Sequence, residues 1–550
     1  MRYFTLSLAI LLSINLAVYA QQQESGGMNM SSQDKPVAIV PGLGAHQHPV
    51  STNNREAQRF FDQGLNYVYA FNHDEAVRSF KRAAELDPQL AMAHWGIALA
   101  LGPNINLDVD PARERAAYEA AQKALSLAAK APENERAYIE AITKRYSIDP
   151  KADLKKLALD YKNAMGQLVK RYPDDLDAAT LYAESAMNLR PWQLWTADGQ
   201  PAEGTLEIVA VLESVLRRNP NHPGAIHYYI HAVEASPNPE RALAYAPKLK
   251  ELMPAAGHIV HMPAHVYMRT GDYEAAAQSN ADAAEADRSY IKSRGVETLY
   301  AAMYYNHNLH FLAIAHSIGG RFAEAHKAAQ QLEDNTGPHL QEMPMLEGFV
   351  ITRPLVLAHF GRWDDILKMA EPAQATAGTK SLRHWARAAS YAAKGRLDDA
   401  LAERKAFLEA RKAIPPVASW GLNSASAILQ LAERVLDAKI ALARKDTKSA
   451  IELLQEAVRA QDAFAYDEPP AWFLPARETL GGVLLRSGRA EEAEKVFRAD
   501  LEKNRRSGRS LFGLMESLKA QGKKEAALMV QKEFEAAWKT ADTQLKVEDL

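Results

Sequence analysis

The histidines of this chain are concentrated in one stretch. Nine of the 17 histidines lie between His222 and His316, where even scatter over 550 residues would give about three. Seven of them are three or four residues apart within short segments, namely His227 and His231, then His258, His261 and His265, then His307 and His310. On a helix this spacing puts side chains on one face. Imidazoles placed in this way can bind one metal ion together.

The rest of the composition narrows the kind of metal site. The chain has no cysteine, which excludes disulfides, thiolate zinc sites and iron–sulfur clusters. A metal must therefore be held by nitrogen and oxygen ligands, which suits a transition metal such as copper, zinc or iron. Glu234 follows His231 by three residues and adds a carboxylate to the same stripe. No glutamate stands beside the first histidine of a pair, so the zincin motif is absent.

Helices in a repeated arrangement are expected to position these residues. From residue 55 onward, apolar residues recur at helical spacing in a sequence rich in Ala, Leu, Glu and Arg. Residues 57–90 carry Phe60, Gly64, Tyr67, Ala76, Phe80, Ala83 and Pro88. The small Gly64 and Ala76 would let two helices approach, the bulky Phe60, Tyr67 and Phe80 would fill the space between them, and Pro88 would end the second helix. Turns with a glycine recur at Gly271, Gly320, Gly361, Gly395, Gly488 and Gly522. A period near 34 residues predicts stacked helix–turn–helix units.

The turns also set a frame on which the histidines can be counted. From repeat starts at Pro223, Gly257 and Asn306, the seven histidines fall at positions 2, 5 and 9 of the first helix. Between residues 91 and 220 the period is looser, and the helices expected there cover 90–101, 112–130, 134–146, 152–171 and 176–189.

The chain resembles exported bacterial tetratricopeptide (TPR) repeat proteins. The resemblance rests on the repeat of residues 57–90 and on three segments, Phe71–Ala76, Ala225–His231 and His258–His265. It implies an all-α TPR solenoid in which positions 2, 5 and 9 face a concave groove. It also implies a protein or peptide partner in that groove, as is usual for TPR arrays.

The N-terminal sequence predicts an export signal. Arg2, an apolar run from Phe4 to Val18 and a small residue at Ala20 are typical of a cleaved signal peptide. We therefore expect a periplasmic or secreted protein with no stable membrane span after cleavage. Further along, His46 and His48 lie on an irregular segment that could fold back and add metal ligands.

These features give a predicted organisation of the whole chain. It consists of a signal peptide (1–20), a flexible lead-in (21–54), N-terminal and degenerate repeats (55–220), histidine-rich repeats (221–335), C-terminal repeats (336–540) and a tail (541–550). A net charge of −3, from 65 basic and 68 acidic residues, argues against nucleic-acid binding.

Three functions remain open at this level. The main hypothesis is an exported TPR protein whose groove binds a transition metal through His46, His48, Glu234 and the seven clustered histidines. The first alternative is a scaffold that binds a protein partner without metal. The second alternative is a metalloenzyme of unknown reaction, because an open coordination position could activate water or oxygen.

Overall fold

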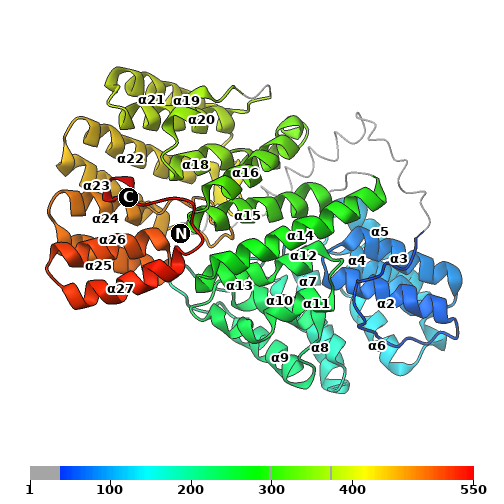
Figure 1. The fold of residues 1–550 in the computed structure, drawn as a ribbon. Coiled ribbons are helices and arrows are strands. Elements are labelled where there is room, and N and C mark those ends of the chain that lie inside the picture. Colours follow the sequence, from blue (N-terminus) through cyan, green and yellow to red (C-terminus); the bar gives the residue numbers. More distant parts are fainter. Residues whose placement is uncertain (1–36, 296–299, 372–373) are drawn as a thin grey trace. The chain divides into compact units, whose positions relative to one another are not determined.

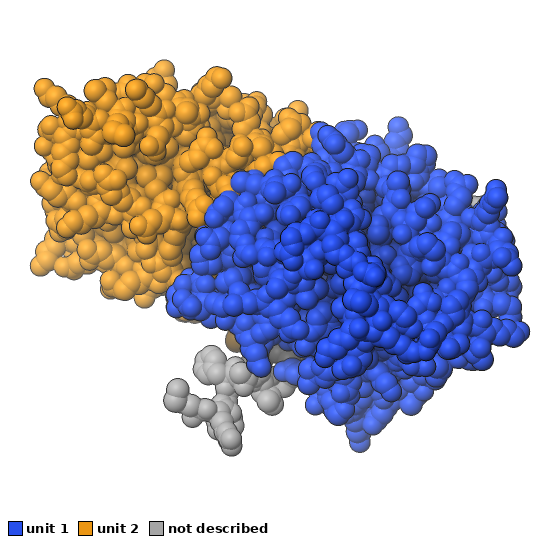
Figure 2. All heavy atoms as spheres, turned by 90° about the horizontal axis from the view of Figure 1, so that it is seen from below, with its two compact units in different colours: residues 1–263, 285–297 blue, residues 264–284, 298–550 orange. Residues whose placement is uncertain are grey.

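The structure of this protein is a computed structural model that describes residues 37–295, 300–371 and 374–550. The chain divides into two compact units, residues 1–263 with 285–297 and residues 264–284 with 298–550 (Figures 1 and 2). The predicted signal peptide, and the lead-in as far as residue 36, lie outside the described residues. Among the described residues, no helix is long and apolar enough to cross a membrane.

The first unit is built from helices. They are α2 (Arg55–Tyr69), α3 (His73–Leu86), α4 (Ala91–Leu101), α5 (Pro111–Leu127), η1 (Ala128–Lys130), α6 (Glu133–Ile142), α7 (Leu154–Arg171), α8 (Leu176–Met187), α9 (Thr205–Arg218), α10 (Pro223–Val233), η2 (Pro239–Ala244), η3 (Ala246–Lys248), α11 (Leu249–Leu252) and α12 (Gly257–His261). The helices predicted between residues 91 and 220 are confirmed as α4 to α8, with ends that differ by a few residues.

Among its described residues, the second unit is also helical, apart from one short strand pair. After α13 (Pro263–Thr270) and α14 (Tyr273–Arg294), which the unit boundaries cut, it contains η4 (Ala301–Tyr305), α15 (Asn306–Ile318), α16 (Phe322–Thr336), η5 (Gly337–His339), η6 (Pro344–Leu346), α17 (Glu347–Val350), α18 (Thr352–His359), α19 (Trp363–Lys368), α20 (Ala377–Ala393), α21 (Leu397–Lys412), β1 (Ser419–Trp420), β2 (Asn423–Ser424), α22 (Ala425–Ala443), α23 (Thr447–Asp462), α24 (Ala476–Arg486), α25 (Ala490–Lys503), α26 (Gly508–Ala520), α27 (Lys524–Ala537) and η7 (Val547–Asp549). The strands β1 and β2 pair antiparallel.

The first predicted repeat is confirmed as the helix pair α2 and α3. Asn54 caps the N-terminus of α2 and Asn72 caps that of α3, each through its side-chain oxygen. The fully buried ring of Phe80 on α3 lies against α2 and α4 at two glycines. A Cβ added to Gly64 would lie 2.7 Å from that ring, and one added to Gly96 would lie 2.5 Å from it. Small residues therefore set the distance between neighbouring helices.

The glycines of the predicted turns explain why the helix pairs repeat. Gly271, Gly320, Gly361, Gly395, Gly488 and Gly522 all have a positive φ, between 63° and 79°. This left-handed backbone ends one helix and reverses the chain, and glycine adopts it without a steric cost. The three repeat starts used as a frame, Pro223, Gly257 and Asn306, are the first residues of α10, α12 and α15.

The contact of Phe80 with two glycines gives a stability prediction. Changing Gly96→Ala should lower the free energy of unfolding by about 1–3 kcal/mol, because the new methyl overpacks against the Phe80 ring. Denaturant unfolding followed by circular dichroism measures this change. The matched control is Gly337→Ala, where an added Cβ meets nothing within 4 Å. Equal effects of the two substitutions would contradict the packing argument.

Candidate metal centre

Three histidines from two helices of the first unit lie together. His227 and His231 are one helical turn apart on α10, and His258 is the second residue of α12. The start of α10 lies close to the end of α2, because Gly224 has no side chain. A Cβ at Gly224 would lie 2.4 Å from the ring of Tyr69. The sequence therefore places the two α10 histidines deep in the unit, where His227 is 0% and His231 is 5% exposed.

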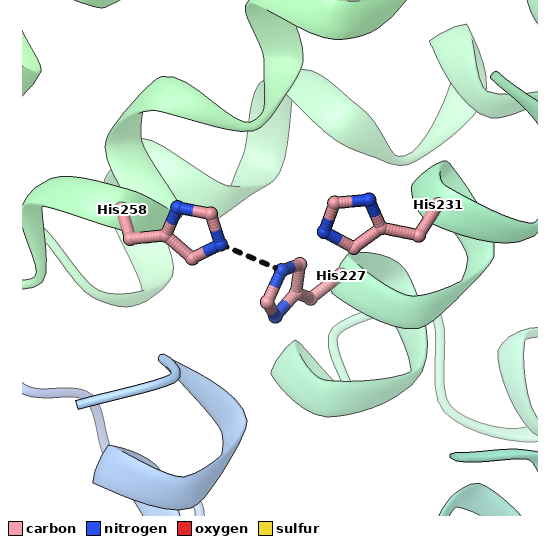
Figure 3. Close-up of side chains that lie close together, drawn as sticks. All are labelled: His227, His231 and His258. Carbon is pink, nitrogen blue, oxygen red and sulfur yellow. Dashed lines mark hydrogen bonds between the residues drawn. The ribbon is translucent and has the colours of Figure 1, made fainter. Parts of the chain in front are cut away.

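The three rings converge with the geometry of a metal site (Figure 3). The Nε2 atoms of His227 and His258 are 3.1 Å apart and share a hydrogen bond (dashed in Figure 3), so a metal ion bound by both rings would take the place of the shared proton. One nitrogen from each of the three rings lies within 4.8 Å of the others. Two nitrogens bound tetrahedrally to one ion, with bonds of about 2.0–2.1 Å, would be about 3.3–3.4 Å apart. The rings of His227, His231 and His258 are thus close to the spacing that shared coordination requires.

The opposite nitrogens of two rings are held by oxygen atoms. Nδ1 of His227 lies 2.6 Å from the carbonyl oxygen of Tyr69, and Nδ1 of His231 lies 2.7 Å from a carboxylate oxygen of Glu234. Both oxygens are acceptors, so Nδ1 carries the proton and Nε2 keeps its lone pair. This is the tautomer that a metal ligand needs, and such oxygen partners are typical of metal-bound histidines. The carboxylate of Glu234 thus contacts Nδ1 of His231, on the other side of the ring from Nε2. Glu234 does not belong to the group formed by the three histidines.

Two aromatic residues with an uncommon backbone contact the rings. Phe71 has a φ of 55°, and its ring centroid lies 4.5 Å from that of His227 and 5.5 Å from that of His258. Trp192 has a φ of 59° and meets His231 edge-on at 5.4 Å. Bulky residues rarely adopt this left-handed conformation, and such residues concentrate at functional sites. Neither aromatic residue is among the predicted metal ligands, although the loop from Asn188 to Trp195 could be expected from its sequence to cover a groove or cap a core. The local signal for Phe71 is its position at a turn where glycine is usual.

The other predicted ligands of α12 to α15 lie elsewhere. His261 is buried in the first unit, and its ring stacks 5.8 Å from that of His258. In the second unit, the rings of His265 and His307 are 6.1 Å apart. His310 meets the ring of Phe349 at 5.5 Å, and burial lowers the pKa of His310 to about 3. His310 is therefore neutral at pH 7.

His46 and His48 contact a different group of the first unit, the buried carboxylate of Asp177 on α8. Nε2 of His46 is 2.9 Å from Oδ1, and Nδ1 of His48 is 2.8 Å from Oδ2. Nε2 of His222 is 3.2 Å from Oδ1, and the Tyr69 hydroxyl donates to the same oxygen. We call these five residues the Asp177 cluster. Sequence analysis assigned neither Asp177 nor His222 to a site. His222 begins the histidine-rich stretch, but it has no histidine three or four residues away, and nothing in its neighbourhood marks Asp177.

The Asp177 cluster differs chemically from the three converging histidines. His222 caps α10, and its Nδ1 accepts the backbone N–H of Ala225. The proton of the neutral ring is therefore on Nε2, where it is donated to Asp177 and leaves no lone pair for a metal. Burial would raise the pKa of Asp177, but hydrogen bonds from His222, His46 and His48 hold it well below its usual range. Asp177 is thus an ionised carboxylate that accepts several donors.

The Asp177 cluster also fixes the course of the N-terminal segment, residues 37–54. Side chains on one face of α2 form hydrogen bonds with the backbone of this N-terminal segment. Gln63 accepts from the N–H of Val40, and Asn66 donates to the carbonyl of His46. Asp62 accepts from the N–H of His48. The segment is therefore tied to α2 through its backbone and to α8 through its two histidines.

A neutral residue at position 177 should release this segment. In Asp177→Asn the buried charge that orients the donors is lost, and the free energy of unfolding should fall by about 3 kcal/mol. Amide exchange should become faster in residues 38–50, as measured by hydrogen–deuterium exchange and mass spectrometry. Asp174→Asn is the matched control, because the Asp174 side chain is 97% exposed. Unchanged protection of residues 38–50 in Asp177→Asn would refute the role of this cluster.

Comparisons with known proteins find only weak similarities. No family model matches this chain, and no curated protein matches it. Among solved structures it is similar to the human IFIT1 dimer, with 14% identity over 89% of this chain and 91% of that chain, at a TM-score of 0.33. Yeast Tom70 has 12% identity over 87% and 90% of the two chains, at a TM-score of 0.28. The TPR domain of P58(IPK) has 12% identity over 85% and 99%, at a TM-score of 0.22. At these TM-scores the similarities carry no further conclusion, and the all-α helical-repeat fold is shown by the helix pairs of this chain itself.

Proposed function

We propose that this chain is a helical-repeat protein that binds one transition-metal ion through His227, His231 and His258. The observation that carries the proposal is the orientation of the rings. Nδ1 of His227 donates to a backbone carbonyl and Nδ1 of His231 donates to a carboxylate, so both Nε2 lone pairs face the centre of the cluster. Copper, zinc and iron all accept three imidazole ligands. An exported location, as the N-terminal sequence predicts, belongs to the same proposal.

Three protein ligands would leave a coordination position for another molecule. Catalytic zinc sites have this composition, with a water or substrate in the fourth position. The carboxylate of Glu234 increases the basicity of His231 and so its strength as a ligand. This open position is what favours a metalloenzyme as the second candidate function. If no ion binds in the next experiment, the result would support the alternative function, a repeat scaffold that binds a protein or peptide partner without metal.

The metal content of purified protein tests the proposal. Untagged protein incubated with Zn(II), Cu(II) or Co(II) and then desalted should retain an ion at this cluster. The double substitution His227→Ala and His231→Ala should lower the stoichiometry by about one ion per chain, as measured by inductively coupled plasma mass spectrometry. His94→Ala is the control, since His94 on α4 is half-buried in the same unit and should leave the stoichiometry unchanged.

The pH dependence of retention adds a second readout. Histidine must be neutral to bind a metal, so protons compete with the ion below a pH of about 6.5. The retained ion should therefore be lost between about pH 6.5 and 4.5. A full complement of metal in the double variant, or no metal in the unaltered chain at pH 7.5, would reject the proposed site.

Glu234 should tune the affinity without being a ligand. Glu234→Gln keeps the size of the side chain but removes the charge that faces Nδ1 of His231. Metal affinity should fall about 10–100-fold with an unchanged stoichiometry, as measured by competition with a chromophoric chelator. Glu251→Gln, at an exposed position of α11, is the matched control. Loss of the ion in the Glu234 variant at saturating metal would instead identify Glu234 as a ligand.

A further inference from the structure

One contact region of the second unit joins helices that are far apart in the sequence. The turn between α15 and α16 meets the start of α26 and the segment that follows α27, residues 538–543. The ring of Trp538 lies between the two sides. A Cβ added to Gly320, in that turn, would lie 2.3 Å from this ring, and one added to Gly508, the first residue of α26, would lie 2.1 Å from it. We call this contact region the seam.

Asp542 supplies the main polar contact across the seam. The N-terminus of α16 receives no side-chain capping hydrogen bond from the residue that precedes it. The Asp542 carboxylate takes this place, since Oδ1 accepts the N–H of Phe322 at 2.7 Å and Oδ2 accepts that of Ala323 at 2.9 Å. The Thr543 hydroxyl donates to the carbonyl oxygen of Gly320 at 2.8 Å. The segment after the last long helix therefore caps a helix that starts 220 residues earlier.

Apolar packing across the seam is thin. Among the described residues, the apolar cluster shared by α24 to α27 also takes in α22, α23 and Leu550, but no side chain of α15 or α16. Residues 541–549 are all half-buried or exposed. At the neighbouring turn, the Tyr273 hydroxyl donates to the carbonyl oxygen of Arg505 at 2.9 Å. Regions with few buried apolar contacts open locally at a low cost in free energy.

A cavity lies in the seam, with walls from both of its sides. Ile318 and His359 line it from α15 and α18, and Ser507 and Arg509 line it at the start of α26. Nε of Arg509 donates at 3.0 Å to the buried carboxylate of Glu478, which also lines the cavity. About 60 Å³ is available to the centre of a water-sized molecule, and one water needs about 10–15 Å³ by this measure. The seam thus encloses a polar space large enough for several water molecules.

We propose that residues 538–543 are a latch. When Trp538 and Asp542 leave their places, the seam opens and small solutes reach the cavity. The helix pairs of a repeat array contact mainly their neighbours, so the α15–α16 turn and α26 are held together by this latch and not by a shared apolar core. Opening would exchange hydrogen bonds with protein for hydrogen bonds with water and would expose little apolar surface. The bond of Tyr273 to Arg505 would keep the movement local. This inference is independent of the metal site, which lies in the first unit.

An engineered cysteine can measure the opening, because the chain has no cysteine of its own. Ser507→Cys places a thiol in the cavity wall, at a residue that is 1% exposed. Adding Asp542→Ala should make its reaction with a chromogenic disulfide reagent about tenfold faster, because two hydrogen bonds that close the seam are lost. Trp538→Ala should also accelerate the reaction, since it removes the ring between the two sides. Glu548→Ala is the matched control, because it removes an exposed carboxylate beyond the latch and should leave the rate unchanged.

A second cysteine separates opening of the seam from a loss of overall stability. Ser390 is 0% exposed on α20 and does not line the cavity, so the thiol of Ser390→Cys should react equally slowly with and without Asp542→Ala. Unchanged labelling of Ser507→Cys in both latch variants would overturn the inference. An equal acceleration at the two cysteines would overturn it too, because global unfolding would then explain the result. Circular dichroism checks that each variant is folded, and Trp538→Ala decides the test if Asp542→Ala is not.

Discussion

The hydrogen bond from Nδ1 of His227 to the carbonyl oxygen of Tyr69 is the contact on which the candidate site depends. Tyr69 is the last residue of α2, so its carbonyl has no partner within the helix and lies at the negative end of the helix dipole. An N–H donor is therefore favoured at this position. The bond holds the His227 proton on Nδ1 and turns the Nε2 lone pair toward His258.

The same tyrosine couples the cluster to the rest of the first unit. Its hydroxyl donates to Asp177, which also binds His46 and His48 of the N-terminal segment. Its ring lies where a side chain at position 224 would be. Because Gly224 has no side chain, α10 can approach α2. One residue thus sets the depth of α10, the orientation of His227 and one contact of the buried carboxylate. A substitution at Tyr69 would remove the hydroxyl bond to Asp177 and the ring contact at Gly224, whereas the bond to His227 uses the backbone carbonyl and would remain.

Local sequence patterns predicted the fold and part of the candidate site. The turn glycines require a left-handed backbone, and that requirement is visible without any knowledge of distant contacts. The pairing of His227 with His231 follows from helical spacing alone. The convergence of His258 with them does not, because it depends on how α12 packs beside α10. Asp177 meets His46 across 131 residues, and Tyr69 meets His227 across 158, so no local signal marks either contact.

The two histidine clusters show why counting histidines could not assign their roles. In a neutral ring one nitrogen carries a proton and the other a lone pair, so the partner of one decides what the other can do. His227 and His231 give their Nδ1 protons to oxygens and direct lone pairs inward. His222 accepts a backbone N–H at Nδ1 and directs a proton at Asp177. Residues of one type, on the same helix or at its cap, are therefore fitted for opposite tasks, metal binding in one case and carboxylate binding in the other.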